Sequence, residues 1–214
     1  TFLSKTFFDN MTHLESISLG NNPLGLVEFD TSIILQNPSL SVLSLHNVGL
    51  QKFPNISSLK FSLQKMYVYT NQIENISLEA FLWANETEDL FQIFPSFTAF
   101  SLYDNPYTSL PEKLFHIMPN LKILRYFSSI KNHRLEPDLS ILNKTLENLM
   151  VSTLLYPAPG MFGMKRLKIL FSRNYDEDLF QFNLSFLASL PNLEKLDIWK
   201  TWRKYIPNLC AVLN

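Results

Sequence analysis

The stretch FTAFSLYDNPY, residues 97–107, contains the pattern that decides the fold of this chain. Phe100 and Leu102 flank Ser101, and this alternation of apolar and polar residues predicts a short strand with one buried face. An asparagine, Asn105, follows three residues after the last apolar position. A side-chain amide there can bond backbone groups that a strand does not reach, so we expect a tight turn after the strand.

The same template, written LxxLxLxxNxL, recurs along the whole sequence, and start-to-start spacings run from 21 to 34 residues. Each strand is too short to be stable alone. We therefore expect the strands to stack side by side and to bury a continuous apolar core. Close copies begin at Leu14, Leu40, Leu63 and Phe97, and looser copies begin at Leu121, Leu146, Leu167 and Leu193.

The template asparagine is unevenly preserved. It is present as Asn22, Asn71 and Asn105, and Ser129 and Thr201 can replace it in part. The corresponding positions Val48, Leu154 and Tyr175 cannot replace it, which predicts irregular turns in the later repeats.

A second signal lies upstream of the strands and predicts an aromatic spine. Phe8, Phe91 and Phe115 each precede a strand-opening residue by six positions, and Phe162 precedes one by five. In LPEKLFHIMPNL, residues 110–121, the chain closely resembles the extracellular leucine-rich repeats of animals, found in Toll-like receptors, insect immune proteins and adhesion ectodomains.

This resemblance covers residues 2 to 209 and implies an α/β repeat solenoid. The expected shape is a curved horseshoe segment, with a parallel β-sheet on the concave face and short helical turns or loops on the convex face. We predict one domain, residues 1–214, of about eight repeats.

Both ends depart from the family pattern, because extracellular members carry cysteine-bonded caps and this sequence has one cysteine, Cys210. We expect a segment without complete N- and C-terminal caps. Cys210 is either the first cysteine of a C-terminal cap or a buried free thiol. The longest spacing, from Leu63 to Phe97, predicts extra residues at 75–95 that form a longer convex arc or an acidic docking knob.

Composition and motifs argue against catalysis. The chain has five glycines, no HExxH and no GxSxG, and its four histidines fall in different repeats. We predict that the protein is not an enzyme and that it holds neither a cofactor nor a metal. Its formal net charge is −1, and no apolar run reaches about 20 residues, so we expect neither a nucleic-acid partner nor a membrane span.

Six N-x-S/T sequons predict N-linked glycans and therefore an extracellular location. None of their asparagines lies in an LxxLxL segment, so glycans would occupy loops and the convex side and leave the strand face open. The six sites are Asn10, Asn55, Asn75, Asn85, Asn143 and Asn183.

The outward positions of the strands form two columns in which aromatic residues and arginines gather near the middle. Tyr, Trp, Met and Arg are enriched at interface cores, so these columns are the candidate ligand-binding site. The alternative is that some of the side chains point sideways and pack on one another across strands. The predicted concave-face site comprises His46, Tyr67, Tyr69, Tyr103, Arg125, Phe127, Phe171, Arg173 and Trp199, and the same columns contain Met150 and Asp197.

The sequence therefore predicts a ligand-recognition module of an extracellular receptor or a secreted immune or adhesion protein. It would bind a protein or microbial ligand on the concave face, and a homo- or hetero-dimer is compatible with it. The alternative is an intracellular leucine-rich-repeat scaffold or substrate-recruiting adaptor. Glycan on any sequon would exclude that alternative.

Overall fold

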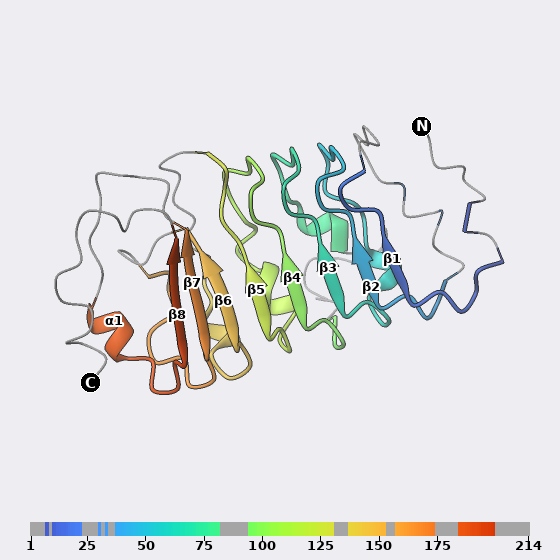
Figure 1. The fold of residues 1–214 in the computed structure, drawn as a ribbon. Coiled ribbons are helices and arrows are strands. Elements are labelled where there is room, and N and C mark those ends of the chain that lie inside the picture. The colour runs from blue at the N-terminus through green and yellow to red at the C-terminus, as the bar shows by residue number, and fades with distance from the viewer. Residues whose placement is uncertain are drawn as a thin grey trace.

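Eight short parallel strands form one sheet in a computed structural model of the chain (Figure 1). The structure describes residues 7–8, 10–22, 30, 33, 37–81, 94–130, 137–152, 157–173 and 184–199. Strand order follows chain order from β1 to β8, with no crossover. The strands are β1 Ser16–Ser18, β2 Val42–Ser44, β3 Lys65–Tyr67, β4 Ala99–Ser101, β5 Ile123–Arg125, β6 Asn148–Val151, β7 Ile169–Arg173 and β8 Lys195–Trp199.

Each strand pairs with the next so that equivalent template positions lie side by side. Phe100 of β4 aligns with Met66 of β3 and with Leu124 of β5. These residues point into the core, where all three are fully buried, and Leu102 is 1% exposed. The prediction of an α/β solenoid whose alternating apolar residues form one continuous core is confirmed.

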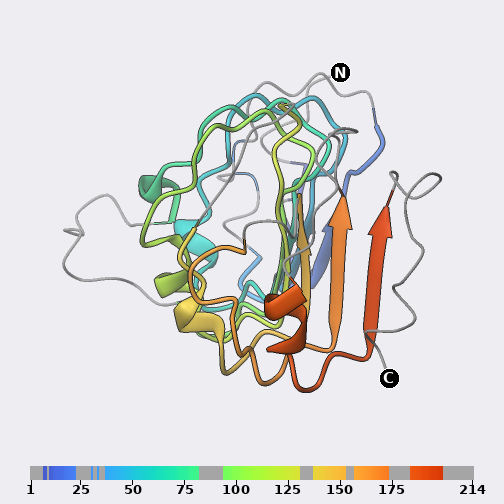
Figure 2. The same ribbon diagram turned by 90° about the vertical axis from the view of Figure 1, so that its left-hand side faces the viewer.

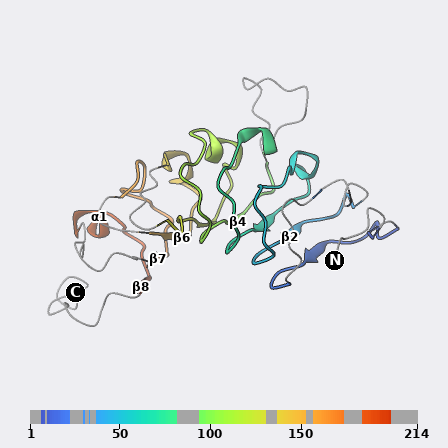
Figure 3. The ribbon, with the colours of Figure 1, turned by 90° about the horizontal axis from the view of Figure 1, so that it is seen from above.

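The return segments carry short helices on the side away from the sheet, as Figures 2 and 3 show. Backbone bonds join neighbouring return segments, for example from Ile56 N to Ala80 O at 2.7 Å and from Leu139 N to Pro159 O at 2.8 Å. In the described part of the chain no helix is long and apolar enough to cross a membrane. The helices are η2 Ser57–Leu59, η3 Leu78–Phe81, η4 Leu114–Ile117, η5 Ser140–Leu142 and α1 Leu184–Ala188.

Template asparagines close the turns after the strands. Asn71 is buried, and its Oδ1 accepts from the N–H groups of Val48, Gly49 and Leu50 at 3.0 to 3.1 Å. Its Nδ2 donates to the carbonyls of residues 45, 68 and 69, so one side chain serves two adjacent repeats. Asn105 repeats the arrangement with Ile73 N and the carbonyls of residues 68, 102 and 103.

Among the described residues, the repeats before and after Asn71 and Asn105 do not have this set of hydrogen bonds between repeats. Asn22 is exposed and donates within its own turn, to Leu19 O and Gly20 O. In the next repeat, Ser128 is buried and forms a bridge with Asn105, whereas the predicted substitute Ser129 is exposed. The prediction for Ser129 is wrong by one residue. Thr201, Leu154 and Tyr175 lie outside the described residues.

Five phenylalanines form the main aromatic cluster of the core, which we call the phenylalanine cluster. Successive ring centroids lie 5.2 to 6.1 Å apart, and most pairs meet at steep angles. The cluster lies at the longest repeat. Of residues 75–95, which the sequence predicts to form a longer convex arc or an acidic docking knob, the structure describes 75–81 and 94–95. Its members are Phe53, Phe81, Phe94, Phe97 and Phe100.

The predicted aromatic spine is partly present. Phe8 and Phe115 are buried as expected, and Phe91 lies outside the described residues. Phe162 is 49% exposed, so its assignment to a buried spine is wrong. Met161, six residues before Leu167, is buried instead, and the Phe162 ring meets the buried Phe186 of the next return segment edge to face at 5.5 Å.

Candidate ligand-binding face

A row of parallel rings crosses the strand face just after the strands end. His46 stacks on Tyr69 at 4.6 Å between centroids and 15° between planes, and Tyr69 stacks on Tyr103 at 4.5 Å and 7°. Tyr103 in turn stacks on Phe127 at 5.2 Å and 27°. The Arg173 guanidinium lies over the far side of Phe127, 5.5 Å from its centroid. We call these five residues the stacked ladder.

Backbone register explains the stacking. The sheet-like hydrogen bonds continue past the strands, because Asn47 N donates to Tyr69 O at 3.1 Å and Thr70 N donates to Tyr103 O at 3.0 Å. Equivalent residues of adjacent parallel strands lie about 4.8 Å apart, which is also the spacing of stacked rings. Repeating an aromatic residue at one template position therefore produces a ladder. Packing across strands, the alternative raised from the sequence, is thus present.

Both ends of the ladder depend on small residues. A Cβ atom on Gly20 would overlap the His46 ring, so glycine at this position leaves space for the imidazole. The His46 Nδ1 atom also lies 2.8 Å from Ser44 Oγ, which helps to hold the ring in place. Ser152 occupies the ladder column between Phe127 and Arg173, and its short side chain allows the guanidinium to reach the Phe127 ring.

One predicted surface residue is buried. Phe127 belongs to the outward column, as expected, but its side chain is 0% exposed. Tyr103 covers one face of the ring and Arg173 lies over the other. The prediction that Phe127 is an exposed anchor is wrong, because stacking on two neighbours removes an outward ring from solvent.

The other predicted residues keep partly exposed side chains. His46, Tyr69, Tyr103 and Arg173 of the ladder are partly buried, and so are Tyr67, Arg125 and Phe171 in the adjacent column. Trp199 is the last residue of β8 and pairs with Arg173 through the backbone, while its side chain lies outside the described residues. The structure thus places His46, Tyr67, Tyr69, Tyr103, Arg125, Phe171 and Arg173 on one face.

The centre of this face combines aromatic and cationic groups. Burial raises the pKa of the Tyr103 phenol, and the neighbouring Tyr69 acts in the same direction. The positive charges of Arg125 and Arg173 lower that pKa, which indicates that both guanidinium groups lie near the hydroxyl. Tyr103 therefore remains a neutral hydrogen-bond donor and acceptor at physiological pH.

A pocket of about 260 Å³ opens on the strand face beside the ladder. The sequence columns contain every residue of this pocket except Ser172, which alternation assigns to the core and which is 3% exposed. The predicted site consists of aromatic and basic residues of these columns, so it does not include Met150 or Asp197. The lining is Tyr103, Met150, Phe171, Ser172, Arg173 and Asp197.

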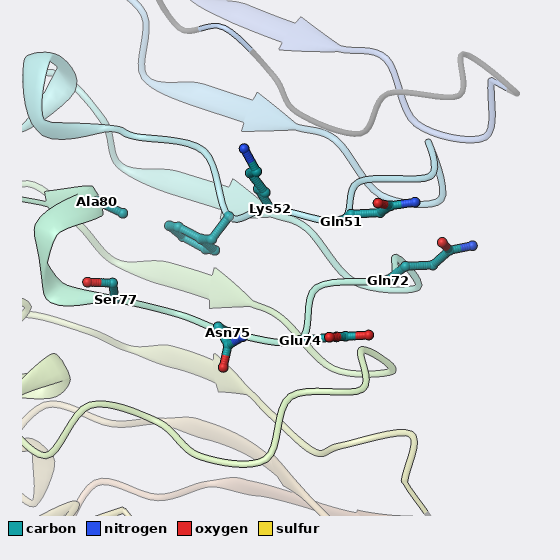
Figure 4. Close-up of a pocket in the computed structure, with 8 residues that line it drawn as sticks. Gln51, Lys52, Gln72, Glu74, Asn75, Ser77 and Ala80 are labelled. Carbon is teal, nitrogen blue, oxygen red and sulfur yellow. The ribbon is translucent and has the colours of Figure 1, made fainter.

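A larger hollow of about 510 Å³ lies on the flank, between the loops that follow β2 and β3 (Figure 4). Lys52 and Gln51 come from one loop, and Gln72, Glu74 and Asn75 come from the other. Asn75 is a sequon residue, so a glycan there would stand at the rim of this hollow. The strand-face pocket is the better candidate for a partner.

The described sequon asparagines lie away from the strands. Asn10, Asn55 and Asn75 are exposed and Asn143 is partly buried, whereas the sequons at 85 and 183 lie outside the described residues. At the second site, Asn55 Oδ1 accepts from the backbone N–H of Ser57 at 3.0 Å and from its hydroxyl at 2.7 Å. This turn leaves the amide nitrogen of Asn55 accessible.

Among the described residues, no group of three His, Cys, Asp or Glu side chains is placed to hold a metal ion. Cys210 lies outside the described residues. The candidate site is thus a surface built from aromatic, arginine and short polar side chains on adjacent strands.

Solved structures of repeat proteins share this architecture. An internalin from Listeria monocytogenes matches with a TM-score of 0.57 and 17% identity, over 91% of this chain and 51% of its own. TLR13, in complex with a single-stranded RNA, matches with a TM-score of 0.59 and 16% identity, over 90% of this chain and 26% of its own. Toll from Drosophila, in complex with Spatzle, matches with a TM-score of 0.50 and 16% identity, over 92% of this chain and 34% of its own.

The chain has the leucine-rich-repeat fold, as its template and these structures agree. It spans about half of the internalin and smaller shares of the two receptors. No protein-family model matches the sequence, and no curated protein matches it either.

Proposed function

We propose that the chain is a ligand-recognition module of an extracellular receptor or of a secreted immune or adhesion protein. It binds a protein or microbial ligand on its strand face, and it is glycosylated on its loops. This is a binding role without catalysis. The observation that carries the proposal is a division of surfaces: partly exposed Tyr, Phe and Arg side chains gather on the sheet, while the four described sequon asparagines lie outside it.

Two further points support this assignment. Tyr and Arg contribute large contact areas at little entropic cost, and such residues carry much of the energy of protein interfaces. Two proteins of the same fold, TLR13 and Toll, are known in complexes with a single-stranded RNA and with Spatzle. One fold can carry many different functions, so the proposal depends on the side chains of the strand face and not on the fold.

The surface assignment is tested by site-specific photo-crosslinking. A benzophenone amino acid placed at Tyr67 on the sheet should cross-link a partner from the native extracellular fluid, and the same amino acid at Lys113 beside η4 should not. Mass spectrometry then identifies the attached protein, and a link to a second copy of the chain would identify a homodimer. Cross-linking at Lys113 but not at Tyr67 would move the binding surface to the convex side.

The location is tested separately. Enzymatic removal of N-glycans in ¹⁸O water converts each glycosylated asparagine to labelled aspartate, which peptide mass spectrometry assigns to a residue. Material from the native source should carry sugar on at least two of the six sequons. Unlabelled asparagine at all six would favour the intracellular scaffold.

A further inference from the structure

The strand-face pocket is the one place where the ladder column is interrupted. Aromatic residues fill that column from His46 to Phe127, and Ser152 follows. The Arg173 guanidinium extends across Ser152 to the Phe127 ring, and the pocket of about 260 Å³ is lined by Tyr103 and Arg173 of the ladder. Pockets for drug-sized ligands measure roughly 300–1,000 Å³, so this one has the size for one or two protein side chains or a small organic molecule.

One side of the pocket is cationic. Arg173 lines it directly, and Arg125 of β5 lies next to the lining residue Met150 of β6 in the strand register. Arg125 Nε is buried and has no hydrogen-bond partner among the described residues. Arg125 does not line the pocket itself, so it acts on a bound anion mainly through its positive charge.

The described lining also contains apolar residues and one acid. Phe171 and Met150 supply hydrophobic surface, and Asp197 lies on the rim. Lys195 partly offsets that acid, because its Nζ lies 3.9 Å from Asp197 Oδ2 and 5.3 Å from the Phe171 ring centroid. In the described part of the chain, Arg173 and Asp197 are the charged residues of the lining, Arg125 and Lys195 lie on adjacent strand positions, and Asp104 acts on the lining residue Tyr103.

We propose that this pocket binds a carboxylate carried by an apolar group, such as a Glu or Asp side chain beside an apolar residue of a partner protein. Guanidinium groups recognise carboxylates through paired, charge-assisted hydrogen bonds. The apolar body of the ligand packs on Phe171 and Met150. Asp197 in the lining repels a bound anion, and the neighbouring Lys195 offsets part of that repulsion.

The inference names the ligand chemistry of the strand face and in that sense rests on the proposed function. Its test uses small probes, so it is independent of any partner. We would titrate phenylacetate and phenylacetamide into the ¹⁵N-labelled chain and follow the backbone amide shifts of residues 101–104 and 170–173. Phenylacetate should bind about tenfold more tightly than the amide of the same shape, the change expected for loss of one charge-assisted hydrogen bond.

Variants assign the effect to residues. Arg125→Gln and Arg173→Gln should each weaken phenylacetate binding by about tenfold. Lys113→Gln removes a positive charge beside η4 and should leave the dissociation constant unchanged, which controls for net charge. If an arginine variant fails to give the amide spectrum of a folded chain, the comparison of phenylacetate with phenylacetamide on the unmodified chain still decides.

Two results would overturn the inference: equal affinity for phenylacetate and phenylacetamide, or no loss of phenylacetate binding in either folded arginine variant. Failure here would leave the Tyr67 cross-linking result untouched. Conversely, a strand face without a partner would leave the carboxylate titration valid.

Discussion

Rings of the phenylalanine cluster meet at steep angles inside the core, whereas rings of the stacked ladder lie nearly parallel on the strand face. Phe94 and Phe97 pack at 67°, while Tyr69 and Tyr103 differ by 7°. Core rings come from loops and strands at different depths and can adopt the edge-to-face contacts that aromatic pairs prefer. Ladder rings come from one template position, so strand spacing imposes their parallel arrangement.

The two arrangements have different consequences, because the phenylalanine cluster stabilises the fold and the stacked ladder forms part of the candidate binding surface. Phe81, Phe94, Phe97 and Phe100 are fully buried, so their packing contributes to folding. Most ladder residues are partly exposed, and their ring faces are occupied by neighbours. The outer parts of the rings and the tyrosine hydroxyls are then what a partner meets. Stacking also fixes the side chains before binding, which lowers the entropic cost of an interface.

The largest expected effect is in the phenylalanine cluster. Phe100→Ala should lower the free energy of unfolding by about 3–5 kcal/mol, the range for a buried aromatic ring whose cavity does not collapse. Urea denaturation followed by circular dichroism measures it. A loss below about 1 kcal/mol would mean that the cluster is not a main source of stability.

A second test compares two asparagines that share one template position. Asn71→Ala should cost about 2–4 kcal/mol, because several buried backbone groups lose their partner at about 1–3 kcal/mol each. Asn22→Ala should cost less than about 0.5 kcal/mol, since that side chain is exposed and bonds within its own turn. Equal losses for the two variants would contradict the role assigned to the bonds between repeats.

The ladder should contribute less. Tyr69→Ala removes two ring contacts, to His46 and Tyr103, each worth about 0.5–1.5 kcal/mol, so we expect a loss of about 1–2 kcal/mol by the same urea assay. Tyr67→Ala, in the adjacent column, is the matched control and should change stability by less than about 0.5 kcal/mol. If both variants behave alike, the stacking has no energetic role.

Alternation in the sequence was sufficient to predict the sheet and its buried residues, as Leu102 and Leu124 show. It also placed Phe127 in the correct column. It could not predict that Phe127 is buried, because that depends on Arg173, two repeats later, reaching across Ser152. Contacts between distant repeats have no signal in a local pattern.

Errors at single positions have the same origin. Ser128, rather than Ser129, is buried beside Asn105, because the turn after β5 differs by one residue from its neighbours. Spacing also assigns Phe162 to the aromatic spine, yet Phe162 is exposed and its neighbour Met161 is buried. A repeat template predicts the periodic part of the fold, whereas the burial of residues that depart from the period is known only from the structure.

The smallest predicted effect concerns the turn that follows each ladder residue. Three residues that directly follow a ladder residue have left-handed backbone angles, with φ of 50° at Asn47, 56° at Thr70 and 62° at Asp104, and Asn21 after Gly20 has a φ of 61°. Asn and Asp tolerate this conformation, but a β-branched residue does not. Thr70 is therefore strained, and its hydroxyl lies 3.3 Å from Asp104 Oδ2, a contact that offsets part of the cost.

Thr70→Asn should relieve the strain and keep a donor for Asp104, much as Asn47 Nδ2 donates to Asn21 Oδ1 at 3.0 Å. We expect a gain of about 0.5–1 kcal/mol in unfolding free energy, within the cost of a left-handed residue of this type. Thr70→Ala loses the contact, so it should not stabilise. Thr70 does not line the strand-face pocket, so Thr70→Asn should also leave phenylacetate binding unchanged. A destabilised Thr70→Asn variant would show that the Asp104 contact, rather than backbone strain, dominates at this turn.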